Sequence, residues 1–491
     1  MVKCRNGDRW GCGMADTPGG ANQLRQNSLG VGAVTFMVVS AAAPLTAVGG
    51  GVPPSMLFGN GAGIAGSFAI VTLILLAFAV GYVAMARHVK NAGAFYAFTA
   101  TGLGGRMGGA AALIAILAYN AMQIGLLGLF GAIAAGTFGE FGLVLPWYVW
   151  SYIAIGIVAV LGYRQVDLSA KVLVVLVLAE FAIVVALDAA ILIAGGDSGL
   201  NLQPFAWSQI TSGVPSIGLL FCFAAFIGFE ATTIYSEEAR DPSVTVPRAT
   251  YASVLLIGVF YTITAWLMVM GVGVDNLMPT LQGYPDPAMF LFELSGRYLG
   301  GAMTTVLGVL FMTSVLAAVI AFHNAVARYK FVAGREGILP DAVGVTHRVH
   351  QSPHVGSVIQ TVLALVVLTV FVVMGLDPVL NLFVWLTQLG TLAVLGLMAL
   401  TSFAVVAFFA KDKRGENVLS TLILPVIAGL IMAYLFVIIF RDFGALTGAA
   451  GSLGWVLPSL TIVFGLVGFA LASGLAGRDP ARFAALGKSR V

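Results

Sequence analysis

Two carboxylates lie in stretches that are otherwise apolar, where hydrophobic packing gives no reason for an ionisable side chain. Glu230 follows Gly228 and Phe229 in FCFAAFIGFEATTIY (residues 221–235), and Glu180 lies in LSAKVLVVLVLAEFAIVV. A charge in an apolar environment is costly unless it is paired, so each acid indicates either recognition of a cation or a hydrogen-bonded structural role. Both interpretations stay open for each acid.

Other polar side chains also occur inside apolar stretches. FMTSVLAAVIAFHNAVAR holds Thr313 and Ser314, hydroxyls of the type that bind sodium, and His323, which could relay a proton. Hydroxyls also bond to their own helix at little cost, which is the more frequent explanation. Three candidate pocket walls, which are also typical of helix packing, are Asn120, Gln123 and Trp385.

A third group, HRVHQSPH, brings His347, His350 and His354 close together in the sequence. It has no cysteine and no helical or finger spacing, so we predict no metal site. The chain has no phosphate-binding loop, nucleophile elbow or zinc-protease motif, so we expect no cofactor and no ATP-driven transport. An intramembrane enzyme would need clustered His, Asp or Ser residues and a channel a continuous polar stripe, and neither pattern is present.

The elements that position these residues are predicted to be membrane-spanning helices. Of 491 residues, 59% are hydrophobic and only 9% are charged, which excludes an ordinary soluble domain. Apolar runs of about 20 residues recur along the chain and are too long and continuous for the strands of an outer-membrane barrel. The twelve predicted spans lie near residues 29–50, 62–85, 108–135, 146–163, 168–195, 213–238, 247–273, 299–328, 355–375, 378–409, 418–440 and 453–476.

Basic residues predict the orientation of the spans, because Lys and Arg in short loops stay on the cytoplasmic side. Alternate connections hold nearly all of them, whereas the opposite connections hold almost only Arg297 and Arg441. We therefore predict a multi-pass protein of the cell membrane with both termini in the cytoplasm, and the net charge of +3 implies no nucleic-acid partner. The basic residues of the predicted cytoplasmic connections are Arg87, Lys90, Arg164, Lys171, Arg240, Arg248, Lys330, Arg335, Arg348, Lys411, Lys413 and Arg414.

The two ends of the chain are predicted to be cytoplasmic tails. Residues 1–27 are polar and rich in glycine without a signal-peptide pattern, which indicates disorder, and residues 477–491 form the second tail. Met14 opens a segment typical of a natural start, so residues 1–13 could reflect the choice of start site. No disulfide framework is expected from the three cysteines, which we predict to be reduced: Cys4, Cys12 and Cys222.

Two of the predicted spans contain helix breakers. In VVSAAAPLTAVGGG, Pro44 removes a backbone donor and frees carbonyls near Ser40 and Ala41. In AFIGFEA, Gly228 loosens the helix beside Glu230. Either break alone could be a simple kink, but matched breaks five spans apart are typical of inverted-repeat transporters with a substrate site at the bilayer midplane.

Four segments resemble, at matching positions, signatures of the amino acid-polyamine-organocation (APC) superfamily of permeases. They are NAGAFYAFTATGLG before the third helix, GFEATTIYSEEARDPSVTVPRAT at the sixth, and AFHNAVARYKFVAGREGILP and HRVHQSPHVGS around the eighth and ninth. The resemblance implies an all-α integral membrane fold of twelve helices with helices 1 and 6 discontinuous. It implies one transporter domain, residues 28–476, with inverted repeats of five helices at about 29–195 and 213–409 and added helices at 418–476.

One segment departs from the family pattern. Relatives that carry amino acids have a glycine-rich break in helix 1 whose free amides bind the substrate carboxylate, whereas this chain has SAAAPLT. Alanine side chains narrow that approach and Pro44 has no N–H, which favours an amine without a carboxylate. Ser40, Thr46 and the amides of residues 41–43 could still bind a carboxylate.

The depth of Glu180 suggests a role in coupling. Counted from Leu168, Glu180 lies ~18 Å along the fifth helix, near the midplane, whereas Asp188, at ~30 Å, is expected near the outer headgroups. By resemblance, proton-coupled relatives keep a lysine here that replaces a bound sodium. A protonated Glu180 would be neutral, whereas a bare carboxylate would hold hydroxyls such as those of Ser40 and Ser314.

Together these features predict a secondary active transporter that imports amino acids or related amines by alternating access, coupled to protons rather than to sodium. The alternative is a polyamine or organic-amine transporter, or an exchanger without net ion coupling. Its expected partners are the substrate, protons and membrane lipid. The predicted substrate-binding residues are Ser40, Ala41, Ala42, Ala43, Pro44, Thr46, Asn120, Gln123, Phe226, Gly228, Phe229, Glu230 and Trp385. The predicted proton-coupling residues are Glu180, Ser314 and His323.

Overall fold

The structure of the protein, a computed structural model, describes residues 30–89, 93–164, 170–234, 239–348, 350, 352–448 and 451–488. The predicted N-terminal tail, with Met14, Cys4 and Cys12, lies outside the described residues. Cys222 is a free and buried thiol.

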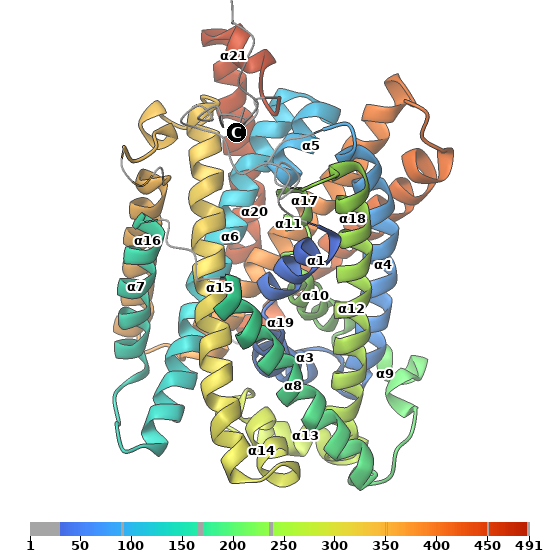
Figure 1. Ribbon diagram of the computed structural model, residues 1–491, viewed down its shortest axis with the longest axis vertical. Helices are drawn as coiled ribbons and strands as arrows, with labels where there is room; N and C mark the ends of the chain where they lie inside the picture. Colours follow the sequence, from blue (N-terminus) through green and yellow to red (C-terminus); the bar gives the residue numbers. More distant parts are fainter. Residues whose placement is uncertain are drawn as a thin grey trace, which may run out of the picture.

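The elements of the described residues are all helical, which confirms the predicted all-α class, and the long helices form one bundle (Figure 1). The helices within the predicted spans are α1 (Val31–Ala41), α4 (Ile64–Ala86), α6 (Gly105–Glu140), α7 (Trp147–Arg164), α8 (Ala170–Ala194), α10 (Pro215–Phe226), α12 (Pro242–Met270), α15 (Gly301–Arg335), α16 (His354–Val373), α17 (Val384–Lys411), α18 (Leu424–Asp442) and α20 (Leu453–Arg478). The shorter helices are α2 (Pro44–Thr46), η1 (Ala47–Gly51), α3 (Val52–Ser55), η2 (Met56–Asn60), η3 (Gly61–Gly63), α5 (Ala94–Leu103), η4 (Gln203–Phe205), α9 (Trp207–Ile210), α11 (Ala231–Ile234), α13 (Val274–Gln282), α14 (Met289–Tyr298), η6 (Asp341–Gly344), η7 (Pro378–Phe383), η8 (Leu419–Ile423), α19 (Gly444–Thr447) and α21 (Pro480–Ala484).

Ten helical stretches of the described chain are long and apolar enough to cross a membrane. One of them, Val31–Ala86, covers the first two predicted spans, and the shorter apolar helix α10 falls in the sixth. Large apolar side chains on the outer helices are exposed, such as Val160 on α7, Leu430 on α18 and Leu466 on α20. Such a surface suits contact with lipid. The count of twelve spans and the inverted repeat stay predictions.

α6 lies in the interior of the bundle, in contact with α15, α17 and α20. Every residue from 108 to 131 on this helix is buried. Small residues allow the close approach: a side chain at Gly109 would collide with Gly468 and Ala472 on α20. α6 is therefore a central element against which the functional helices pack.

The first predicted span is interrupted near its middle. α1 ends at Ala41, Ala43 has the left-handed backbone (φ 45°) that residues other than glycine rarely adopt, and α2 begins at Pro44. Proline suits the first position of a helix, because an N–H there would have no partner within the helix. The interruption lies in the segment where Pro44 predicts it.

The sixth predicted span also stops inside the bundle. α10 ends at Phe226, Ile227 is extended, and Gly228 has φ 117° before α11 begins at Ala231. Only glycine adopts that backbone without strain, so Gly228 is required for the chain to turn here.

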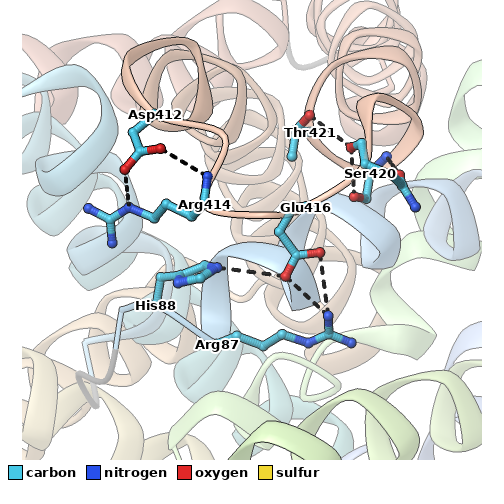
Figure 2. A network of polar contacts seen from close by, with 8 residues as sticks. Arg87, His88, Asp412, Arg414, Glu416, Ser420 and Thr421 are labelled. Carbon is cyan, nitrogen blue, oxygen red and sulfur yellow. Dashed lines mark hydrogen bonds and ion pairs between the residues drawn. The ribbon is translucent and has the colours of Figure 1, made fainter.

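Polar contacts join several segments at the end of the bundle that carries α5 and α21, opposite the end with α13 and α14 (Figure 1). Arg87, which follows α4, donates to Glu416 in the loop after α17 (3.1 Å), and His88 lies 3.6 Å from the same carboxylate (Figure 2). In that loop the N–H of Arg414 donates to Asp412 (3.0 Å). Segments that the charge pattern assigns to the cytoplasm thus meet at one end.

The C-terminal segment packs against the loop after α15. Arg482 of α21 pairs with Asp341 (2.7 Å), and the N–H of Gly487 donates to Glu336 (3.0 Å). Part of the predicted C-terminal tail is therefore a docked helix.

Candidate functional site

A cavity of about 60 Å³ lies beside both interruptions. The two interrupted helices enclose it together with α4, α6, α15 and α17. Three residues predicted to bind substrate line it: Ala42, Ala43 and Thr46. The other lining residues are Ala47, Gly51, Phe68, Met122, Leu126, Phe221, Ala224, Ala225, Ile227, Ala318, Phe322, Phe383, Thr387 and Gln388.

The wall of this cavity is mostly apolar. Its polar side chains are Thr46, Thr387 and Gln388, and none of the described residues that line it is ionisable. Thr46 and Thr387 donate their hydroxyl protons to Ser314 Oγ (3.0 Å) and to the carbonyl of Phe383 (2.7 Å). The Oε1 atom of Gln388 is buried and has no hydrogen-bond partner in the described part of the chain. Gln388 therefore offers the cavity a buried amide oxygen that no described residue uses.

Glu180 of α8 reaches the interruption of the first span. Its Oε2 atom accepts the N–H of Leu45 (3.3 Å) and the hydroxyl of Ser314 (2.7 Å). Ser314 Oγ accepts in turn from the N–H of Thr46 (3.3 Å). The first N–H groups of a helix have no acceptor within the helix, so Glu180 and Ser314 act as their acceptors. A carboxylate also suits this end of the helix, which carries partial positive charge. The suggested contact with Ser314 is present, whereas the side chain of Ser40 lies outside the described part.

Glu230 occupies the interruption of the sixth span. Its Oε2 atom accepts the N–H of Gly228 (2.9 Å), and its Oε1 atom accepts the hydroxyl of Tyr119 on α6. Its backbone carbonyl accepts the hydroxyls of Tyr82 (3.2 Å) and Thr233 (2.9 Å). The side chain is 2% exposed and is not among the lining residues of the cavity. These contacts fit the bracing role, and amine recognition by Glu230 stays a prediction.

Phe226 and Phe229 pack inside the bundle and do not line the cavity. Phe229 meets the ring of Phe78 edge-on at 5.9 Å, and Phe226 meets Tyr261 edge-on at 6.3 Å. The aromatic residues of the cavity wall come from other positions that the sequence pattern does not single out: Phe68, Phe221, Phe322 and Phe383.

A buried polar cluster lies between α6, α15 and α16. Lys330 donates to Asn120 Oδ1 (3.2 Å) and to Gln360 Oε1 (2.8 Å), and Gln360 Nε2 donates to Gln123 Oε1 (2.6 Å). Asn120 and Gln123 therefore contact this cluster and are not lining residues of the cavity. The assignment of Lys330 to a loop is wrong, because α15 continues beyond the apolar run to Arg335 and buries this lysine.

His323 and Trp385 also lie away from the cavity wall. His323 Nε2 is 2.8 Å from the hydroxyl of Ser357 on α16. Trp385 Nε1 donates to the carbonyl of Leu446 (2.9 Å). Both side chains therefore contact neighbouring helices or connections.

Two further polar residues have partners that the sequence leaves open. Asp188, expected near the outer headgroups, is 8% exposed and accepts the hydroxyl of Thr264 on α12 (2.7 Å), because the two helices pack face to face. Thr313 donates to the carbonyl of Leu310 in its own helix (2.9 Å), which is the more frequent arrangement for a helical hydroxyl.

The three histidines of the HRVHQSPH segment gather around the ring of Tyr163. Desolvation, and then the neighbouring His350 and His354, lower the pKa of His347. Within the described ranges, no group of three or more His, Cys, Asp or Glu residues is placed to hold a metal ion.

Apolar membrane helices, two of them interrupted beside a cavity, are the arrangement of a membrane transport protein. The chain belongs to the amino acid permease family, whose model matches residues 29–470. This membership confirms the resemblance to the APC superfamily. The family transports amino acids or amines, and its relatives are permeases.

Two relatives illustrate the range of named substrates. The chain is 25% identical over 251 residues to a low-affinity putrescine importer of Escherichia coli (strain K12), covering 50% of this chain and 51% of that protein. It is 25% identical over 273 residues to a branched-chain amino acid permease of Bacillus subtilis (strain 168), covering 55% and 52%. The matched part spans about half the length of these relatives.

A solved structure shares the fold. The chain is similar to a manganese transporter of Eremococcus coleocola in complex with an aromatic bis-isothiourea substituted compound, with a TM-score of 0.59 and 15% identity. The match covers 95% of this chain and 99% of that chain. At this identity the similarity shows the fold alone.

Proposed function

We propose that the chain is a secondary active transporter that imports an amino acid or a related amine by alternating access, with proton coupling through Glu180. Membership of the amino acid permease family supports the substrate class. The observation that supports coupling is that one Glu180 oxygen accepts both the N–H of Leu45 and the hydroxyl of Ser314. These three groups belong to different helices beside the cavity.

Protonation of Glu180 would change the contact between these helices. A carboxylate accepts strong, charge-assisted hydrogen bonds from both donors, whereas a neutral acid accepts weaker ones. Taking up a proton therefore loosens α8 from the second half of the first span and from α15, while the bonds between Ser314 and Thr46 persist. Helices that are held less tightly can separate as access changes from one side of the membrane to the other.

Glu230 would control the path toward the end that carries α5 and α21. Its partner Tyr119 stacks on Tyr329, with ring centroids 5.1 Å apart, and lies 5.9 Å from the ring of Phe322, which lines the cavity. These side chains close the route between the cavity and that end. Opening it requires the Tyr119 contact to break, while the bond between Glu230 and Gly228 can persist.

The test compares wild type with Glu180→Gln in liposomes, using leucine, putrescine and isoamylamine as radiolabelled probes and subtracting uptake by protein-free liposomes. Glutamine mimics the protonated acid, so counterflow of the accepted probe should persist at a similar rate. Accumulation driven by an imposed pH gradient should be lost. Ser402→Ala is the matched control and should behave as wild type, because the buried Ser402 hydroxyl donates to the carbonyl of Met398 in its own helix (3.0 Å).

Two outcomes would reject proton coupling through Glu180. The first is accumulation by Glu180→Gln at the wild-type level. The second is wild-type uptake that follows a sodium gradient, or neither gradient, in which case exchange without net coupling explains transport.

A further inference from the structure

We propose that the substrate is a monoamine with an apolar body and no carboxylate, and that Gln388 accepts a hydrogen bond from its ammonium group. This assignment rests on the proposed function, because it specifies the substrate class of the same cavity. It follows from which polar groups around the cavity are already in use and which are not.

Three backbone N–H groups at the interruptions, which could otherwise bind a substrate carboxylate, already have side-chain partners. At the first interruption the N–H of Leu45 donates to Glu180, and the N–H of Thr46 donates to Ser314. At the second, the N–H of Gly228 donates to Glu230. Pro44, the first residue of α2, has no N–H. The protein's own side chains thus occupy three N–H groups that a carboxylate could otherwise use.

The carboxyl-terminal ends of two helices lie beside the cavity. α1 ends at Ala41 and α10 at Phe226, and residues beside both ends, Ala42 and Ala225, line the cavity. The carboxyl-terminal end of a helix carries partial negative charge on its free carbonyl groups. Two such ends near one cavity favour an ammonium group over an anion.

Gln388 supplies the specific acceptor. Its side chain is 1% exposed, lines the cavity, and has an Oε1 atom without a partner among the described residues. The hydroxyl of Thr387 donates to the carbonyl of Phe383, so its oxygen is left to accept from Gln388 Nε2 at 3.4 Å. This orientation directs the amide NH₂ to Thr387 and leaves Oε1 for a donor, which a substrate ammonium provides.

The rest of the wall limits the substrate to one charge. The lining holds four phenylalanines, whose ring faces attract a cation, and within the described part of the chain it holds no ionisable residue. A carboxylate would be buried without a cationic partner, and the second ammonium of a diamine would lack a carboxylate. An alkyl or aryl body fits this surface. The cavity therefore favours a monoamine over both an α-amino acid and putrescine.

The test is equilibrium binding and thermal stabilisation of the purified protein in detergent, with isoamylamine, leucine and putrescine. Isoamylamine is leucine without its carboxylate, so the pair isolates the effect of that group. We expect isoamylamine to bind at least tenfold more tightly than either leucine or putrescine. Equal or tighter binding of leucine or of putrescine overturns the assignment.

Variants of Gln388 test the named acceptor. Gln388→Leu removes it and should weaken isoamylamine binding at least tenfold, whereas Gln388→Glu keeps an acceptor, adds a negative charge and should bind the amine at least as tightly as wild type. Ser402→Ala, on the same helix, should leave binding unchanged. Unchanged affinity in Gln388→Leu, with a melting temperature equal to wild type, overturns the role of Gln388.

The outcomes separate this inference from the proposed function. Uptake of leucine that is driven by protons and lost in Glu180→Gln keeps the transport mechanism and overturns the monoamine assignment. Tight binding of isoamylamine with uptake that ignores a pH gradient keeps the monoamine assignment and overturns proton coupling. Binding of none of the three probes overturns both.

Discussion

At the first interruption the carboxylate that accepts a free N–H comes from another helix, whereas at the second it comes from the interrupted segment itself. Glu180 is 135 residues from Leu45 along the chain, and Glu230 is two residues from Gly228. Both carboxylates meet the same requirement, because an N–H group in a bilayer has no water to bond with. The first depends on how α8 packs against α2, and the second does not.

This difference indicates which interruption can respond to a moving helix. The bond between Glu230 and Gly228 survives any rigid displacement of the segment that contains both residues. The bonds of Glu180 to Leu45 and Ser314 exist only while α8, α2 and α15 are together. Glu230, a local cap, therefore preserves the conformation of its own segment when helices move. Glu180, a cross-helix cap, binds the end of α2 only while the helices of the bundle keep their present arrangement.

The largest expected effect on stability is that of Glu230→Ala. The change leaves the Gly228 N–H and the Tyr119 hydroxyl without partners in a buried site, and each unsatisfied group costs about 1–3 kcal/mol. Glu180→Ala should cost less, because Ser314 keeps its contact with Thr46. Thermal unfolding in detergent measures the order of the two variants.

Glu230→Gln serves as the control for this pair. Its amide oxygen still accepts from Gly228, so its melting temperature should lie between those of wild type and Glu230→Ala. A larger loss of stability for Glu180→Ala than for Glu230→Ala would contradict the distinction between a local and a cross-helix cap.

A smaller effect is expected from Ser314→Ala. This change removes one donor to Glu180 and one acceptor for Thr46, and a typical intramolecular hydrogen bond contributes about 1 kcal/mol. Thr313→Val is the matched neighbour, because the Thr313 hydroxyl donates to the carbonyl of Leu310 in its own helix and its removal should cost no more than about 0.5 kcal/mol. Equal melting temperatures for the two variants would show that the cross-helix contact does not stabilise the fold.

Local chemistry explains which of these features the sequence could predict. Pro44 lacks a backbone donor and Gly228 adopts a left-handed backbone, so each marks a helix end whatever surrounds it, and α1 and α10 end beside them. The acids Glu180 and Glu230 stand out because few charges occur in apolar runs. Apolar composition in the same way predicts the all-α membrane fold without any knowledge of its packing.

The side chains that line the cavity could not be predicted in this way, because lining depends on how helices are rotated against one another. Gln388 faces the cavity, whereas Asn120 and Gln123, which are equally polar, face Lys330 and Gln360. Nothing in the spacing of these residues along their helices distinguishes the two environments. The signal that was available for Gln388 is its polar amide within the apolar run of α17.

The smallest expected effect concerns an acid outside the membrane spans. Like Glu230, this acid accepts a backbone N–H from a residue two positions away in its own segment. Asp286, in the loop before α14, accepts the N–H of Ala288, two residues away (2.8 Å). Burial, with a smaller contribution from the charge of Asp377, raises the pKa of Asp286 from 3.8 to about 6. The hydrogen bond from Ala288 favours the carboxylate but does not offset burial.

The sign of the resulting pH dependence follows from proton binding. Between about pH 4 and pH 6 the folded protein holds a proton on Asp286 that the unfolded chain has lost, so the free energy of unfolding should fall as the pH rises and then level off. Asp286→Asn cannot titrate, so its melting temperature should fall less than that of wild type over this interval. Parallel curves for the two proteins would show that Asp286 does not titrate there. The Asp286→Asn protein lacks the titration of Asp286, so it serves as the background for a second test. Any pH dependence of its melting temperature that disappears on adding Glu180→Gln is due to Glu180.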